Sequence, residues 1–144
     1  MKIIIAVGLR GEMLFNNRRV SRDEYIIDDM MALTGGKLTA KQYSAKLFLR
    51  YPEVRISDAA VSSLKESEWC FIEDESLGQL LPLATSLVVY NFGRTYPSEL
   101  KFDTVPTEIG FIEISRKKFA GHSHDEITRT VYERATSNSK DNSK

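Results

Sequence analysis

The apolar positions of the chain fall into short runs separated by polar segments. Residues 2–8, KIIIAVG, form a run rich in isoleucine and valine, which is typical of a strand buried on both faces at the centre of a mostly parallel sheet. Runs over 69–73 and 86–91 predict two more strands, and 76–83 between them predicts a helix. Connections as short as these indicate consecutive α/β units.

A helix is predicted over residues 22–34. Ser21 and Glu24 form a capping box, apolar residues follow at helical spacing, and a glycine pair at 35–36 provides the stop. The segment before this helix, 16–19, is polar and is expected to be a mobile loop.

The middle and the end of the chain carry weaker patterns. A short strand over 37–39 and a second amphipathic helix over 41–49 are predicted, whereas 51–68 is polar and reads as connections. An irregular excursion follows over 92–103. Alternation of apolar and polar residues then predicts a strand over 108–115.

Residues 123–134 are compatible with two structures. Ser123 and Glu126 form another capping box, which favours a helix, but the β-branched sequence ITRTVY favours a strand. Beyond Arg134 the tail ATSNSKDNSK is almost free of apolar residues, so we expect a single domain over 1–134 and a disordered tail over 135–144.

Composition narrows the class of protein. The chain has 144 residues, and its 20 basic and 20 acidic side chains cancel without a basic stripe, which makes a nucleic-acid partner unlikely. The apolar run after Lys2 is too short for a signal peptide or a membrane span, so we expect a soluble cytoplasmic protein with no membrane partner. The single cysteine, Cys70, lies in an apolar run and is expected to be a buried structural thiol.

Several of these segments together resemble the dihydrofolate reductase family. The resemblance implies an α/β, three-layer fold: a central mostly parallel sheet with flanking helices and an antiparallel C-terminal edge. It rests on pattern rather than on invariant motifs and covers most of the chain to Arg134. The segments that carry it are IIIAVGLRGEMLFNNRR, SRDEYIIDDMMALTGGKL, AKQYSAKLF, FIEDESLGQLLPLATSLVVY and GHSHDEITRTVYER.

The same resemblance points to a degenerate NADPH site. Glu73 and Asp74 stand where the family has a glycine pair against the cofactor, and carboxylates there would repel a pyrophosphate. The family's other phosphate-holding turn falls near Lys41 and Ser44, which keeps a cation but loses the glycine. The segment between this turn and Trp69 is also shorter than in the family.

On the substrate side, the family needs a buried carboxylate that binds a pterin ring and helps to deliver a proton. Alignment without gaps places Ile26 at that position, whereas a helix extended at its start places Asp23 there. Asp23 is equally an ordinary first-turn acid that favours a helix N-terminus.

His122, His124 and Asp125 resemble the HxHxDH metal-binding run of metallo-β-lactamase-fold hydrolases, ribonuclease Z among them. These are the only two histidines in the chain, and a dinuclear site needs several more. The alternative interpretation is a turn or a capping segment.

Three functions therefore remain open from the sequence. The leading hypothesis is a reductase-like protein that has lost NADPH-dependent folate reduction and binds an unknown small molecule or protein. The second is a divergent NADPH-dependent reductase of a pterin-like substrate, with Asp23 as the acid and Lys41 on a phosphate. The third is a metal-dependent ribonuclease acting through His122 and His124.

Overall fold

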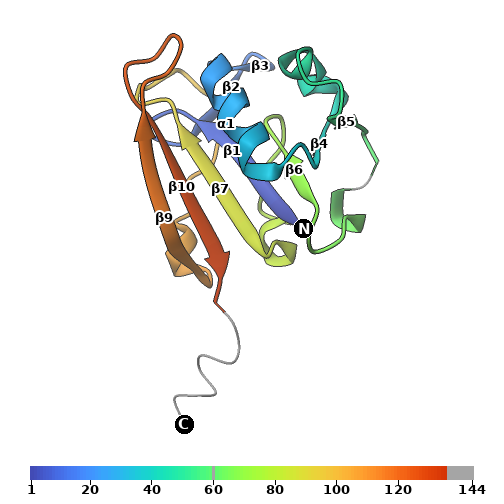
Figure 1. The fold of residues 1–144 in the computed structure, drawn as a ribbon. Helices are drawn as coiled ribbons and strands as arrows, with labels where there is room; N and C mark the ends of the chain where they lie inside the picture. The colour runs from blue at the N-terminus through green and yellow to red at the C-terminus, as the bar shows by residue number, and fades with distance from the viewer. Residues whose placement is uncertain (60, 136–144) are drawn as a thin grey trace.

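A seven-stranded mixed sheet forms the centre of the molecule in this computed structural model, which describes residues 1–59 and 61–135 (Figure 1). The central strand β1 lies between β6 and β7, and both pair with it in parallel. In spatial order the strands are β5 (Arg55–Ile56), β4 (Leu38–Ala40), β6 (Trp69–Phe71), β1 (Lys2–Val7), β7 (Ser86–Asn91), β10 (Ile127–Arg134) and β9 (Phe111–Phe119).

The two faces of the sheet carry separate apolar cores. Successive side chains of a strand point to opposite faces, so Ile4 joins the core under helix α1 and Ile3 and Ile5 join the other. All three isoleucines are fully buried, which explains why the run contains no polar residue from Ile3 to Val7. The sequence-based assignment of this strand to the centre of the sheet is confirmed.

Helix α1 (Glu24–Thr34) lies across one face of the sheet (Figure 1). Its N-cap is Asp23, whose carboxylate accepts the N–H of Tyr25, so the predicted Ser21–Glu24 capping box is wrong and the helix begins later than predicted. The helix ends at Gly35 in the left-handed conformation (φ 65°), as the predicted stop requires.

Two of the predicted α-helices have another form. The predicted helix over 41–49 is a 3₁₀-helix, η1 (Gln42–Phe48). The predicted helix over 76–83 is wrong, because only its last turn, η3 (Leu81–Leu83), is helical and is again 3₁₀. Gly78 lowers helix propensity there, and Pro82 lacks the N–H and would collide with the carbonyl four residues earlier in an α-helix.

The C-terminal edge of the sheet is antiparallel. β10 pairs with β7 on one side and with β9 on the other, so residues 127–134 form a strand and the helical alternative is wrong. Strand pairing on both sides satisfies the backbone, and the β-branched residues fit the pleated surface. The predicted disordered tail lies outside the described residues except for Ala135, which donates to the carbonyl of Gly110.

A small second sheet joins β3 (Arg18–Arg19), β2 (Glu12–Phe15) and β8 (Leu100–Lys101). The segment predicted as a mobile loop is a tight hairpin, in which Asn16 and Asn17 have positive φ angles of 52° and 59°, as a type I′ turn requires. The short helices η2 (Val61–Ser63) and η4 (Pro106–Glu108) complete the fold. No helix in the described ranges is long and apolar enough to cross a membrane.

Candidate functional site

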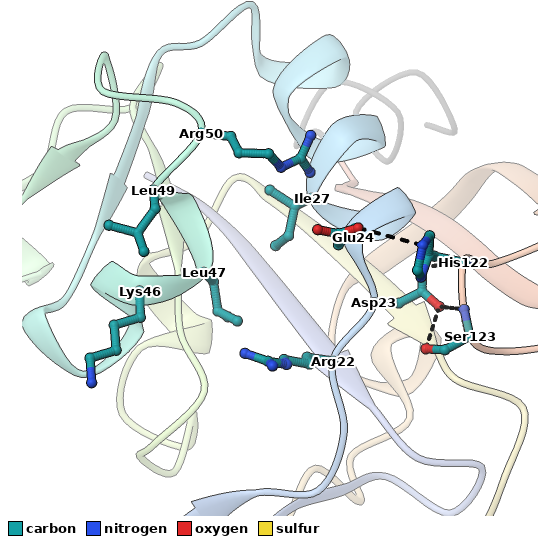
Figure 2. Close-up of a pocket in the computed structure, with 10 residues that line it drawn as sticks. All are labelled: Arg22, Asp23, Glu24, Ile27, Lys46, Leu47, Leu49, Arg50, His122 and Ser123. Atoms are coloured by element: carbon teal, nitrogen blue, oxygen red, sulfur yellow. Dashed lines mark hydrogen bonds and ion pairs between the residues drawn. The ribbon is translucent and has the colours of Figure 1, made fainter.

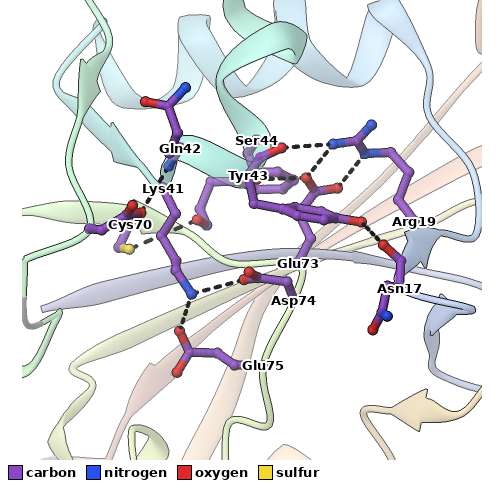
Figure 3. Close-up of polar contacts among 12 residues, drawn as sticks. Asn17, Arg19, Lys41, Gln42, Tyr43, Ser44, Cys70, Glu73, Asp74 and Glu75 are labelled. Carbon is purple, nitrogen blue, oxygen red and sulfur yellow. Dashed lines mark hydrogen bonds and ion pairs between the residues drawn. The ribbon is translucent and has the colours of Figure 1, made fainter.

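The acidic turn that follows β6 folds back onto two polar side chains. Glu73 is buried and forms two hydrogen-bonded contacts with Arg19, from Nε to Oε1 and from Nη2 to Oε2, each 2.9 Å long. Its Oε2 also accepts the hydroxyl of Ser44 at 2.6 Å. The Glu73 carboxylate is therefore held by a cation from the β2–β3 hairpin and by a hydroxyl from η1 (Figure 3).

Lys41 forms ion pairs with two other carboxylates of the same turn. Its ammonium group lies 3.1 Å from Asp74 Oδ1 and 2.9 Å from Glu75 Oε2 (Figure 3). Burial lowers the pKa of Lys41, but the hydrogen bonds that it donates to the two carboxylates outweigh this and raise the pKa. Both residues that the sequence predicted for phosphate binding, Lys41 and Ser44, thus donate to the carboxylates of the turn.

Arg19 closes this network from the other side. The hydrogen bonds to Glu73 raise the pKa of its guanidinium group above the ordinary value, which keeps it charged. The same group lies 5.2 Å from the ring centre of Tyr43 and donates to the carbonyl of that residue. The network therefore joins the hairpin, η1 and the end of β6 into one unit.

Asp23 occupies a second polar centre, at the start of α1. Its carboxylate accepts the backbone N–H groups of Tyr25, His122 and Ser123 at 2.8–2.9 Å, and the Nδ1 atom of His124 lies 2.7 Å from Oδ2. Burial raises the pKa of Asp23, but these hydrogen bonds lower it to about 2. The carboxylate is ionised at neutral pH and lies in a position that fixes the 121–124 loop.

Gly121 makes this close approach possible. A Cβ atom at this position would lie 2.6 Å from Asp23 Oδ2 and 3.0 Å from the carbonyl oxygen of His124. Any larger residue would therefore push the loop away from the carboxylate.

A cavity of about 550 Å³ lies beside Asp23, between α1 and η1 (Figure 2). Ile27, Leu47 and the largely exposed Leu49 supply apolar surface to it. Its polar lining carries both signs of charge, the cations of Arg22, Lys46 and Arg50 and the carboxylates of Asp23 and Glu24. Arg50 is paired with Asp28, whereas in the described part of the chain no carboxylate forms an ion pair with Arg22 or Lys46. The cavity thus offers apolar walls and free positive charge to a ligand.

The other residues considered from the sequence lie elsewhere. Ile26 is buried in the apolar core, so the alignment without gaps places no acid at that position. His122 is exposed against the ring of Tyr25 and lies 3.6 Å from Glu24, and Asp125 is exposed. Within residues 1–59 and 61–135, no three His, Cys, Asp or Glu side chains are grouped so that they could hold a metal ion.

The comparisons with known proteins rest on structure alone. No family model and no curated protein matches the sequence. The structure superposes on a dihydrofolate reductase from Enterococcus faecalis, solved in complex with NADP(H) and RAB-propyl, with a TM-score of 0.60 and 11% sequence identity over 94% of this chain and 97% of that one. The chain therefore has a dihydrofolate-reductase-like α/β fold, as expected, whereas the ribonuclease Z label has no support.

The sequence did not indicate two of the contacts that define these centres. Arg19 was assigned to a polar loop, and nothing in its neighbourhood indicates a partner 54 positions away. The sequence predicts His124 as a metal ligand or as part of a turn or capping segment, and neither interpretation includes the contacts of its ring with Asp23 and Ser21. The one feature of the sequence that could have indicated these contacts is the position of His124 in a polar turn next to a predicted strand.

Proposed function

We propose that this protein binds a small ligand with an apolar body and an anionic group in the cavity between α1 and η1, and does not hold NADPH as a reductase cofactor. The observation that carries this proposal is the acidic turn, defined as residues 73–75, whose carboxylates occupy Lys41 and Ser44. These side chains supply from within the protein the negative charge that a phosphate would bring from outside.

The energetic argument against a dinucleotide at the turn is electrostatic. At an effective dielectric constant of about 20, two like unit charges about 4 Å apart repel by about 4 kcal/mol. A phosphate that approached Lys41 would meet Asp74 and Glu75 at similar distances, in addition to losing the glycine backbone that permits close approach. The acidic turn therefore opposes binding by charge and by bulk.

The ligand side of the proposal rests on the lining of the cavity. Arg22, in the segment before α1, and Lys46, in η1, line the cavity together with Ile27 and Leu47 (Figure 2). Apolar walls with a few cationic groups suit a flat or aliphatic molecule that ends in a carboxylate or a phosphate. A protein partner that inserts an acidic side chain is the alternative occupant.

The first experiment is a titration of NADPH, followed by thermal denaturation and by the fluorescence of Trp69. A ligand that binds only the native state raises its apparent stability by mass action. We expect no shift at millimolar NADPH and a saturable shift with p-aminobenzoylglutamate, which carries an aromatic body and carboxylates. A saturable shift of several degrees with NADPH would overturn the proposal.

A second candidate, a divergent NADPH-dependent reductase, is favoured by one observation, that Asp23 lines the cavity. In that mechanism Asp23 is the acid and Lys41 contacts a phosphate, so both would have to leave their present hydrogen-bond partners. Consumption of NADPH with dihydrofolate, abolished in Asp23→Asn, is the result that this candidate requires. The absence of turnover above the blank would exclude it.

A further inference from the structure

Ser21, His124 and Asp23 form a continuous hydrogen-bonded relay at the start of α1. Ser21 Oγ lies 2.8 Å from Nε2 of His124, and Nδ1 of the same ring lies 2.7 Å from Asp23 Oδ2. Serine, histidine and carboxylate in this order are the arrangement that activates a serine in several unrelated hydrolase folds. We propose that Ser21 is the nucleophile and His124 the general base of an ester-hydrolase site.

The carboxylate determines which nitrogen of the imidazole carries the proton. Asp23 already accepts three backbone N–H groups and is ionised at neutral pH, so it accepts and does not donate. The Nδ1 atom of His124 must therefore be the donor in this contact. In the neutral ring the Nε2 atom then offers its lone pair to the hydroxyl of Ser21, which is the state that a general base needs.

Packing holds the imidazole in this orientation. The ring of Phe92 lies against that of His124, with the ring centres 4.9 Å apart and the planes tilted by 31°. The side chains of His124 and Asp23 are 4% and 0% exposed, respectively. A base and its orienting carboxylate that are shielded from water keep their geometry between turnovers, so Asp23 acts as a positioning residue.

Ser21, in contrast, is accessible. It is partly exposed and lines a second cavity of about 780 Å³. This cavity shares only Arg22 and Ser123 with the lining of the α1–η1 cavity. The relay thus runs from a buried carboxylate through a buried ring to a partly exposed serine. A substrate can therefore reach the serine while the base and its carboxylate stay shielded from water.

Charge on the wall of this cavity indicates the class of substrate. Arg18 and Arg22 line it, and within the described residues neither forms an ion pair. Their guanidinium groups suit a carboxylate or phosphate on the substrate. The backbone N–H of Arg22, which follows the nucleophile, has no hydrogen-bond partner in residues 1–59 and 61–135 and is the candidate donor to an oxyanion.

The reaction that follows is hydrolysis of a carboxylic ester in two steps. Ser21 Oγ attacks the ester carbon while His124 Nε2 takes the hydroxyl proton, and the bond to the alcohol oxygen breaks as His124 returns that proton to it. Water then attacks the acyl carbon and gives a proton to His124. The bond to Ser21 breaks, the hydroxyl recovers its proton, and the carboxylic acid leaves as the second product.

The first test is covalent labelling with an alkyl fluorophosphonate, which reacts with an activated serine by loss of fluoride. We expect mass spectrometry to find the adduct on Ser21 in the native protein and none at that site in Ser21→Ala. The exposed Ser115 of β9 supplies the control, because Ser115→Ala should label at the native rate. Labelling on Ser123 instead, or equal labelling of Ser21 and Ser115, would overturn the proposal.

The role of His124 is tested by a variant that cannot accept the proton. His124→Gln should slow labelling of Ser21 by about a hundredfold, the usual contribution of a general base. Native-like thermal denaturation must accompany this result. A folded His124→Gln protein that labels at the native rate would show that the relay is only a structural hydrogen-bond network.

Ser21→Cys provides a second route that does not depend on the alanine variant. The imidazole next to the new thiol should raise its rate of alkylation by iodoacetamide above that of free cysteine at neutral pH. Cys70 does not compete, because burial raises the pKa of its thiol to about 12. The double variant Ser21→Cys with His124→Gln should lose the enhancement, and its persistence would contradict the role of the ring.

The substrate class is tested with two p-nitrophenyl esters, the neutral acetate and the anionic hemisuccinate. The arginines predict that the native protein hydrolyses the hemisuccinate faster, and that Arg22→Ala removes the difference. Failure of Ser21→Ala to abolish hydrolysis of both esters would overturn the proposal. This outcome is distinguishable from a failure of ligand binding in the α1–η1 cavity, which is measured without turnover.

Discussion

The acidic turn and the α1–η1 cavity use the same kinds of charged residue in opposite ways. At the turn, Arg19 and Lys41 are each held by one or two carboxylates of the chain itself. At the cavity, Arg50 is paired with Asp28, but Arg22 and Lys46 have no such partner among the described residues. A cation that is already paired offers little to a ligand, so the comparison locates the available binding energy at the cavity and not at the turn.

Replacement of Glu73 is expected to have the largest effect on stability, because its carboxylate is the buried partner of both Arg19 and Ser44. Glu73→Gln would leave the partly buried guanidinium of Arg19 without its carboxylate, at a cost of about 3 kcal/mol in the free energy of unfolding. Urea denaturation measures this change. Glu75→Gln is the control, since Glu75 is 39% exposed and its pair with Lys41 contributes less than about 1 kcal/mol.

Equal losses of stability in the two variants would show that the buried pair of Arg19 with Glu73 contributes no more than the exposed pair of Lys41 with Glu75. The acidic turn would then be a set of surface ion pairs, and its claim to fill the cofactor position would weaken.

A smaller effect is expected when acid titrates Asp23, at the edge of the cavity. The pKa in the folded protein is about 2, below the ordinary value of 3.8, so the stabilisation by the ionised carboxylate is complete above about pH 4 and is lost as the pH falls towards 2. The amount is about 2 kcal/mol. Denaturation measured between pH 5 and pH 2 follows it.

The matched variant for this titration is Asp23→Asn. It should be less stable at pH 7 and should show a weaker dependence on acid, because the carboxylate that contacts His124 is gone. An unchanged acid profile in Asp23→Asn would mean that other carboxylates account for the loss.

The smallest effect on stability is expected from replacing Arg22. This variant tests whether an unpaired cation of the cavity contributes to ligand binding rather than to folding. Arg22→Ala should change the free energy of unfolding by less than about 0.5 kcal/mol, because no partner is lost. Affinity for p-aminobenzoylglutamate should fall by about fivefold, which corresponds to about 1 kcal/mol. Calorimetry measures the binding, with Arg94→Ala as an exposed control outside the cavity lining.

The strands were predictable from the sequence to a greater extent than the helices. The run 2–8 could only be a doubly buried strand, since it contains no polar residue from Ile3 to Val7. The helix predicted over 76–83 is wrong because Gly78 and Pro82 disfavour an α-helix more than the apolar spacing favours one. Residues 127–134 remained ambiguous because a strand between two neighbours and an amphipathic helix need similar side chains.

Only part of the candidate site could be predicted. That Glu73 and Asp74 stand where dihydrofolate reductases have a glycine pair stays a prediction from the resemblance. The partners of these carboxylates do not follow from the sequence, because Arg19 reaches Glu73 across 54 positions through the β2–β3 hairpin. Asp23 was identified as a candidate acid, and its catalytic role stays a prediction.

The sequence by itself determined the central position of the strand at 2–8, the α/β class and the acidic character of the turn after β6. These features are local, since apolar runs, charges and glycine stops act over a few residues. The tertiary structure alone decided that Ser21 meets His124 and that Lys41 is satisfied while Arg22 is not. Such pairings depend on distances between segments far apart in the chain, and only the packing of those segments sets these distances.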